Sequence, residues 1–83
     1  MHKQMLFDAT IEIKGIDRKG MLLDVSKVIS DQLGINIHKV TISSDNGIFD
    51  GTIELRVHDR EEVKTIMNQL RNIDDLQEVQ RIL

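Results

Sequence analysis

The stretch that decides the fold is Leu6–Leu33, which reads LFDATIEIKGIDRKGMLLDVSKVISDQL. Its apolar residues change their spacing once along the way. From Leu6 to Lys14 apolar and polar residues alternate, which predicts a strand with one buried face. The segment Gly15–Gly20 interrupts this alternation with two glycines and predicts a loop.

A helical spacing begins immediately after that loop. Apolar residues recur every three or four positions from Met21 to Leu33, and Gly34 follows as a typical helix stop. The predicted apolar stripe of this helix consists of Leu22, Val25, Ile29 and Leu33, widened by Met21 and Val28.

The remaining chain continues the same pattern of short elements. Strands are predicted at Ile35–Ser44 and Phe49–Val57, joined by the turn residues Asp45-Asn46-Gly47. Asp59 and Glu62 are spaced as a capping pair for a second helix, which carries the stripe Val63, Ile66, Met67 and Leu70. A last strand is predicted at Leu76–Leu83. The order βαββαβ predicts an α+β, ferredoxin-like fold, a four-stranded antiparallel sheet with two helices on one face.

Composition restricts the class of protein. The 83 residues suit one domain, expected at residues 5–83, and residues 1–4 carry no pattern and are expected to be an added start or a linker remnant. A net charge of −3 argues against DNA binding, and no apolar run is long enough for a membrane span. A soluble, cytoplasmic domain is therefore expected. There is no cysteine for a disulfide or a thiolate metal site.

No residue pattern indicates catalysis. The three histidines lack the spacing of a metal site, and no nucleophile stands near a histidine in the sequence. We therefore expect no catalytic residue, no metal and no cofactor. An RNA-recognition module of this topology needs aromatic side chains on the outer face of its sheet. Phe7 and Phe49 are the only aromatics, and both fall on the predicted inner face.

Two features suggest binding. The first is the loop Gly15–Gly20, which leads into a helix whose first backbone N–H groups lack intrahelical partners. Such a helix start accepts a carboxylate or another anion. An equally plain interpretation is that Asp17 caps the helix and Gly20 permits tight packing.

The second feature is the strand Ile35–Ser44. Ile37 and Val40 have opposite parity, so either a bulge near His38-Lys39 resets the phase or both faces are covered. In the predicted strand order this strand is an edge with Lys39 as its only charge. The alternatives are an ordinary bulged edge and an edge that pairs with a second copy. We expect the homodimer, with contacts through Ile37, Lys39, Val40, Thr41 and Ile42.

The segment Gly15–Val25, GIDRKGMLLDV, resembles the D-R-x-G-L-L-x-D-[IV] signature of ACT domains, the regulatory modules of metabolic enzymes. Ile35-Asn36-Ile37, the Asn46-Gly47 turn and Ile53–Val57 follow at the expected distances. Within that family the chain looks most like the C-terminal ACT domain of the RelA/SpoT enzymes, the GTP pyrophosphokinases and guanosine tetraphosphate hydrolases of the stringent response.

The resemblance implies a function without catalysis by the domain itself. ACT domains bind small ligands, often amino acids, beside the first strand-helix loop at the interface of two copies. By position this implies ligand binding by Asp17, Arg18, Lys19 and Gly20, and by Asn36 and Ile37 at the facing start of the second strand. The family often has proline where this chain has Lys19. The implied partners are the other domains of a RelA/SpoT enzyme and the ribosome. The alternatives are an amino-acid sensor, freestanding or in another enzyme, and a docking module for protein or ribosomal RNA.

Overall fold

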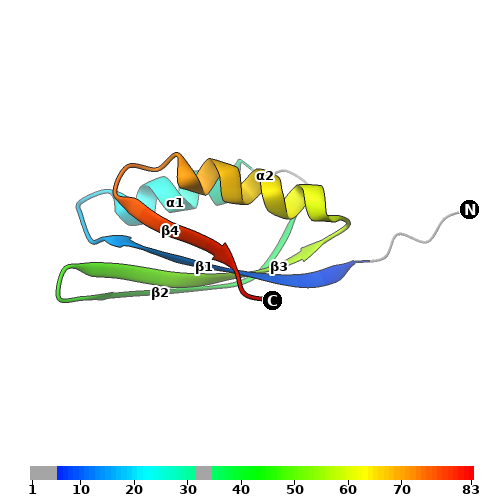
Figure 1. Cartoon of the computed structure of the whole chain (residues 1–83), viewed down its shortest axis with the longest axis horizontal. Coiled ribbons are helices and arrows are strands. Elements are labelled where there is room, and N and C mark those ends of the chain that lie inside the picture. Colours follow the sequence, from blue (N-terminus) through cyan, green and yellow to red (C-terminus); the bar gives the residue numbers. More distant parts are fainter. Residues whose placement is uncertain (1–5, 32–34) are drawn as a thin grey trace, which may run out of the picture.

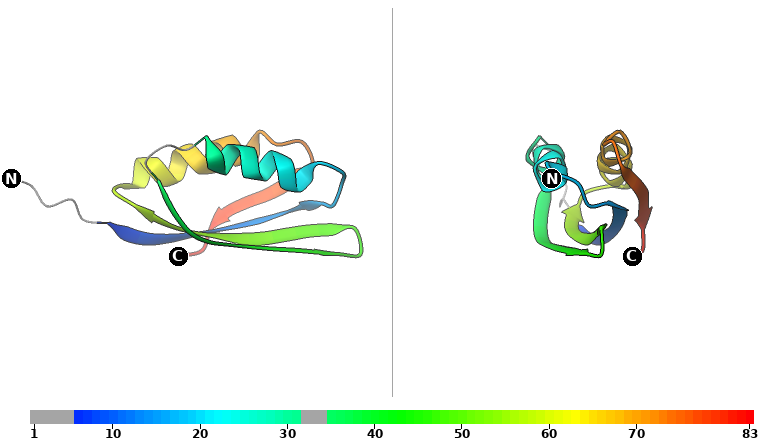
Figure 2. Two further views of the ribbon diagram at one scale, coloured as in Figure 1. Left: turned by 180° about the vertical axis from the view of Figure 1, so that it is seen from behind. Right: turned by 90° about the vertical axis from the view of Figure 1, so that its left-hand side faces the viewer.

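The computed structural model describes residues 6–31 and 35–83, and its elements follow the order βαββαβ (Figure 1). They are β1 (Phe7–Ile16), α1 (Met21–Ser30), β2 (Asn36–Asp45), β3 (Ile48–Val57), α2 (Arg60–Arg71) and β4 (Leu76–Arg81). The strands form one antiparallel sheet in the order β2-β3-β1-β4. Both helices lie side by side over one face of this sheet (Figure 2). The ferredoxin-like prediction is confirmed.

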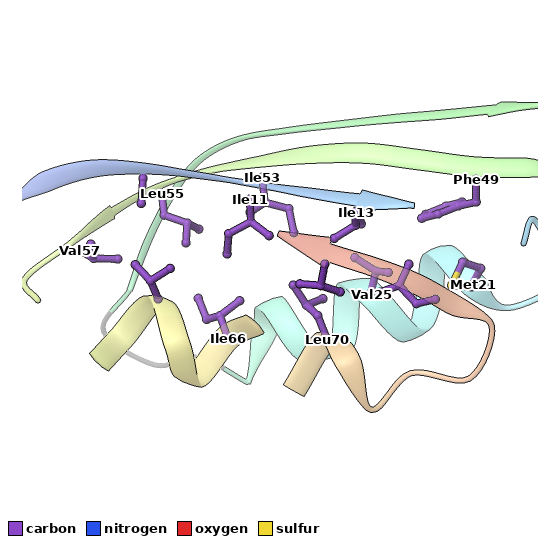
Figure 3. Packing of buried hydrophobic residues seen from close by; sticks show 14 residues of the cluster. Ile11, Ile13, Met21, Val25, Phe49, Ile53, Leu55, Val57, Ile66 and Leu70 are labelled. Atoms are coloured by element: carbon purple, nitrogen blue, oxygen red, sulfur yellow. The ribbon is translucent and has the colours of Figure 1, made fainter. Parts of the chain in front are cut away.

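The core lies between the helices and the two central strands. Alternate residues of β1 and β3, such as Ile11 and its cross-strand partner Ile53, are fully buried. The residues between them, such as Glu12 and Thr52, lie on the opposite face of the sheet. From the helix layer, α2 contributes Val63, Ile66 and Leu70, and α1 contributes Met21 and Val25 (Figure 3). The period-2 and helical patterns of the sequence therefore meet in one apolar layer.

The first strand is longer than the sequence predicts. It continues past Lys14 to Ile16, and Gly15 pairs with Phe49 on one side and Leu76 on the other. A Cβ at this glycine would lie 2.3 Å from the backbone oxygen of Asp75. Gly15 is therefore a strand residue and not a loop residue. Its missing Cβ allows the backbone at Asp75 to approach the strand closely. The connection between β1 and α1 is only four residues, 17–20.

The apolar stripe of α1 is rotated from its predicted position. Met21 and Val25 are buried, Val28 and Ile29 pack partly against the core, and Leu22 is 55% exposed. Neighbouring helical residues are 100° apart, so only one of Met21 and Leu22 can point fully inward. In the described residues α1 ends at Ser30, and the predicted end at Leu33 and Gly34 lies outside them.

The edge strand β2 contains the predicted bulge. Ile37 pairs with Leu55 and Lys39 pairs with Glu54, so the residue between them is the extra one. The shift places Ile37, Val40 and Ile42 on the face that the helices cover. No residue of β2 is fully buried.

The predicted cap of the second helix is also present. The Asp59 carboxylate accepts the backbone N–H of Glu62 at 3.1 Å, and the Glu62 carboxylate accepts that of His58 at 2.5 Å. These bonds satisfy donors that the helix itself cannot pair. Within the described part of the chain no helix has the length and hydropathy to cross a membrane.

Candidate functional site

An open pocket of about 570 Å³ lies where the β1–α1 loop meets the start of α1 and the far ends of β2 and β3. Apolar side chains form most of its lining, and Phe49 lies between this end of the sheet and α1 (Figure 3). The residues that line it are Asp17, Arg18, Gly20, Leu22, Leu23, Ser26, Ile42, Ser44 and Phe49. Three elements and one loop therefore build the pocket.

The loop enters the helix through a tight turn. The Met21 N–H donates to the Arg18 carbonyl at 3.1 Å, and Gly20 has φ 87° and ψ −4°. This geometry is that of a type II turn with Lys19 and Gly20 at its centre. Gly20 is also the N-cap residue, and no side chain in the described ranges caps α1. The first turn of α1, which lines the pocket, therefore keeps backbone donors without a side-chain acceptor.

Asp17 does not cap the helix, contrary to one of the two interpretations of the sequence. Its carboxylate accepts a hydrogen bond from the Ser44 hydroxyl, and its backbone N–H donates to the Gly47 carbonyl at 2.9 Å. Both contacts join the loop to the β2–β3 hairpin. They hold the carboxylate at the polar rim of the pocket.

Arg18 holds the loop to the opposite side of the molecule. One Nη donates to the Asp24 carboxylate and to the Asp74 carbonyl, each at 2.8 Å, and Nε donates to the Asp75 carboxylate at 3.1 Å. The hydrogen bond to Asp24, followed by the charges of Asp24 and Asp75, raises the pKa of Arg18 above its ordinary value. The guanidinium therefore joins the pocket to the α2–β4 connection.

The sequence-predicted ligand residues fall into two groups. Asp17, Arg18 and Gly20 line the pocket, whereas Lys19 lies outside the lining and accepts an Arg18 hydrogen bond with its carbonyl at 3.1 Å. Asn36 and Ile37 lie at the opposite end of β2. At about 3.3 Å per residue, Ile37 is about 23 Å along the strand from Ser44. Within one copy, the two groups are not brought together.

The pocket includes residues that the sequence does not predict for it. Leu22 and Leu23 are both more than half exposed, and Ile42 and Ser44 face them from β2. The sequence contains one indication of them, the two consecutive leucines at the helix start. Neighbouring residues of a helix cannot both point into one core, so at least one leucine must be exposed. Ile42 and Ser44 cannot be placed in the pocket from the sequence alone. The bulge between Ile37 and Lys39 decides on which face of the sheet they lie.

The chain matches the ACT domain family over residues 3–81. It belongs to the ACT domains, a family that the fold and the loop motif both indicate.

The chain is similar to parts of a guanosine-3′,5′-bis(diphosphate) 3′-pyrophosphohydrolase and of a GTP pyrophosphokinase. The chain is 28% identical over 83 residues to a guanosine-3′,5′-bis(diphosphate) 3′-pyrophosphohydrolase of Spiroplasma citri, covering 98% of this chain and 11% of that one. It thus spans about a tenth of that relative's length. The crystal structure of the ACT domain from GTP pyrophosphokinase of Chlorobium tepidum matches with a TM-score of 0.87 and 29% identity, over 94% of this chain and 100% of that chain. The solution structure of that domain has a TM-score of 0.83 and 30% identity, over 93% and 86% of the two chains.

Proposed function

We propose that this chain is a non-catalytic regulatory domain of a RelA/SpoT-type enzyme, and that a free amino acid in the Asp17–Phe49 pocket modulates synthesis or hydrolysis of guanosine tetraphosphate. The ligand proposal rests on one observation, that three kinds of binding group lie in the same pocket. An uncapped helix start, an oriented carboxylate and an apolar wall meet there.

Each part of an amino acid has a partner in this pocket. The backbone donors at the start of α1 suit the ligand carboxylate, helped by the partial positive charge of a helix N-terminus. The Asp17 carboxylate, oriented by Ser44, suits the ammonium group. Leu22, Leu23 and Ile42 offer an apolar surface to the ligand side chain.

The pocket needs a second wall for so small a ligand. Its volume of about 570 Å³ lies within the range of about 300–1,000 Å³ that holds larger, drug-sized molecules. We propose that a second copy supplies this wall by pairing through β2, whose Val40 is 40% exposed. Antiparallel pairing places the start of one β2 beside the end of the other. Asn36 and Ile37 of the second copy would then stand near Ser44.

Arg18 offers a route from the pocket to the rest of the enzyme. It touches the pocket and also holds the α2–β4 connection through Asp74 and Asp75. A ligand carboxylate that competes for this guanidinium would loosen that connection. A ligand regulates only if it binds one state of the enzyme better than the other, and this competition supplies such a difference.

Ribosomal RNA docking on the open face of the sheet has less support. Lys14 stands beside Asp50 and Glu78 in register, and Lys39 stands beside Glu54. Phosphate binding needs cations that outnumber neighbouring carboxylates. The open face mixes both signs.

Calorimetric titration of the chain with each of the twenty amino acids tests the proposal. We expect saturable heat with one amino acid or a related few, and loss of that heat in Leu23→Lys, which places a charged chain in the pocket. Lys27→Gln, on another part of α1, is the matched control. Twenty titrations without saturable heat would reject the amino-acid site. In the intact enzyme, Leu23→Lys is expected to remove the response of guanosine tetraphosphate synthesis to that amino acid while leaving its basal rate.

A further inference from the structure

A second surface lies on the other side of the molecule, along α2 and β4. A groove of about 330 Å³ runs there, and Figure 2 shows α2 beside β4, away from β2. Its lining is two apolar residues and four cations, namely Arg60, Val63, Lys64, Met67, Arg71 and Arg81. We call this surface the basic groove. No carboxylate of the described residues lines it.

The cations of the basic groove form a regular row. Arg60, Lys64 and Arg71 are four and seven residues apart on α2, so they follow one side of the helix with Met67 between them. The row is about 16 Å long at 1.5 Å per residue. Arg81 faces it from the end of β4. The length of the row equals about three turns of an α-helix.

These charges are largely free of acidic partners. In residues 6–31 and 35–83 no Asp or Glu side chain forms an ion pair with Arg60, Arg71 or Arg81. Arg71 donates to the Asn68 side chain and the Val79 carbonyl, and Arg81 donates to the Leu83 carbonyl. Lys64 has only a 3.8 Å contact with exposed Glu61. The cations therefore remain available to an acidic partner.

The position of Arg60 is unfavourable for the helix itself. It is the first residue of α2, where the helix dipole favours negative charge. The chain carries 14 acidic and 11 basic residues, yet four of those 11 gather on this one groove. Arg60 therefore opposes the charge preference of a helix N-terminus and belongs to a basic cluster in an acidic protein. Such a departure indicates that these cations serve binding rather than stability.

We propose that the basic groove docks an acidic amphipathic helix of a partner protein, with one apolar ridge seated on the half-buried Met67, beside which Val63 lies buried, and carboxylates on both flanks. Charge complementarity selects this occupant, and the apolar floor distinguishes it from a phosphate backbone, which would leave that floor uncovered. The groove is at the β4 side of the sheet, so pairing through β2 leaves it open. The proposal does not depend on an amino-acid ligand.

Fluorescence anisotropy with a labelled synthetic helix tests this docking. The probe has about four turns, a leucine ridge and glutamates on either side. We expect saturable binding that the double substitution Arg60→Glu and Arg81→Glu weakens at least about tenfold. The substitutions Lys14→Glu and Lys27→Glu give the same net charge elsewhere and are expected to leave binding unchanged. Circular dichroism confirms that both variants fold, and amide NMR is expected to place the bound peptide on α2.

Several results would overturn the proposal. They are equal binding by the two charge-reversed variants, equal binding of a peptide with serine in place of leucine, and tighter binding of a single-stranded RNA of similar length. Loss of self-association in the Arg60/Arg81 variant would assign the groove to a second copy instead.

Discussion

The two helices cover the sheet unequally. On the β4 side, α2 buries Val63, Ile66 and Leu70 completely and packs closely against β4. On the β2 side, α1 buries Met21 and Val25 and leaves Leu22 and Leu23 more than half exposed, above a strand without a fully buried residue. The end-on view in Figure 2 shows the two sides together.

The unequal covering predicts that stability and binding depend on different sides of the molecule. Beside the central strands, the α2 side contributes more completely buried side chains to the core than the α1 side does, and burial of apolar surface stabilises a small domain. The α1 side keeps apolar residues at a sheet edge, where an isolated domain usually carries charges. We therefore expect substitutions on the α2 side to change the free energy of unfolding, and those on the α1 side to change association and ligand binding.

The largest expected effect is on the α2 side. Leu70→Ala is expected to lower the free energy of unfolding by about 2–5 kcal/mol, because it leaves a cavity in a packed core. The matched change Leu23→Ala removes an exposed side chain and is expected to cost about 0.5 kcal/mol or less. Urea denaturation at low protein concentration measures both. Equal losses would contradict the division between the two sides.

The next effect concerns the edge of the sheet. Val40→Lys puts a charge on β2 and is expected to weaken the proposed dimer at least about tenfold. Thr52→Lys, on β3 inside the sheet, should leave the dimer intact. Sedimentation equilibrium gives the dissociation constants. A parent chain that stays monomeric at high concentration would show that the β2 edge is not an interface.

Arg18 links the two sides, and its removal sharpens their comparison. Arg18→Gln is expected to speed hydrogen exchange in the α2–β4 connection, since it removes the contacts with Asp74 and Asp75. A raised arginine pKa means that the contribution of this charge is complete below the ordinary pKa and is lost only in strong alkali. Exchange measured at neutral pH therefore reports the fully charged contact. If hydrogen exchange around residues 72–76 is unchanged, Arg18 does not couple the pocket to the α2–β4 connection.

The smallest expected effect is stabilising. Lys19 is the second residue of the type II turn, the position where proline is favoured. Lys19→Pro is therefore expected to raise the free energy of unfolding by about 0.4–1 kcal/mol by restricting the unfolded chain. Thermal denaturation checks the sign. A loss of stability would show that the turn has another geometry.

The sequence predicted what depends on local spacing. The alternation in β1, the Asn46-Gly47 hairpin and the Asp59 cap are each written in neighbouring residues, and the structure confirms all three. The pocket depends on contacts between distant segments. Asp17 meets Ser44, and Arg18 meets Asp75, 57 residues further along the chain. No spacing rule connects such residues, so sequence placed Asp17 in the site without its partner.

The same reason explains the errors. Gly15 looked like a loop residue because glycine breaks an alternating pattern, yet its missing Cβ admits the Asp75 carbonyl beside the strand. The sequence predicts Leu22 in the core because its spacing from Val25 and Ile29 suits a helical stripe as well as the spacing of Met21 does. Packing against the sheet decides between these neighbours.

An amide NMR titration of the chain with the amino acid that gives calorimetric heat tests the central proposal most directly. We expect concerted, saturable shifts at Asp17–Leu23 and Ser44, together with Asn36 and Ile37, because in the proposed dimer the second copy would bring the latter pair to the same ligand. Shifts confined to the first group would contradict the shared site, and a silent spectrum at Asp17–Leu23 would contradict the pocket itself.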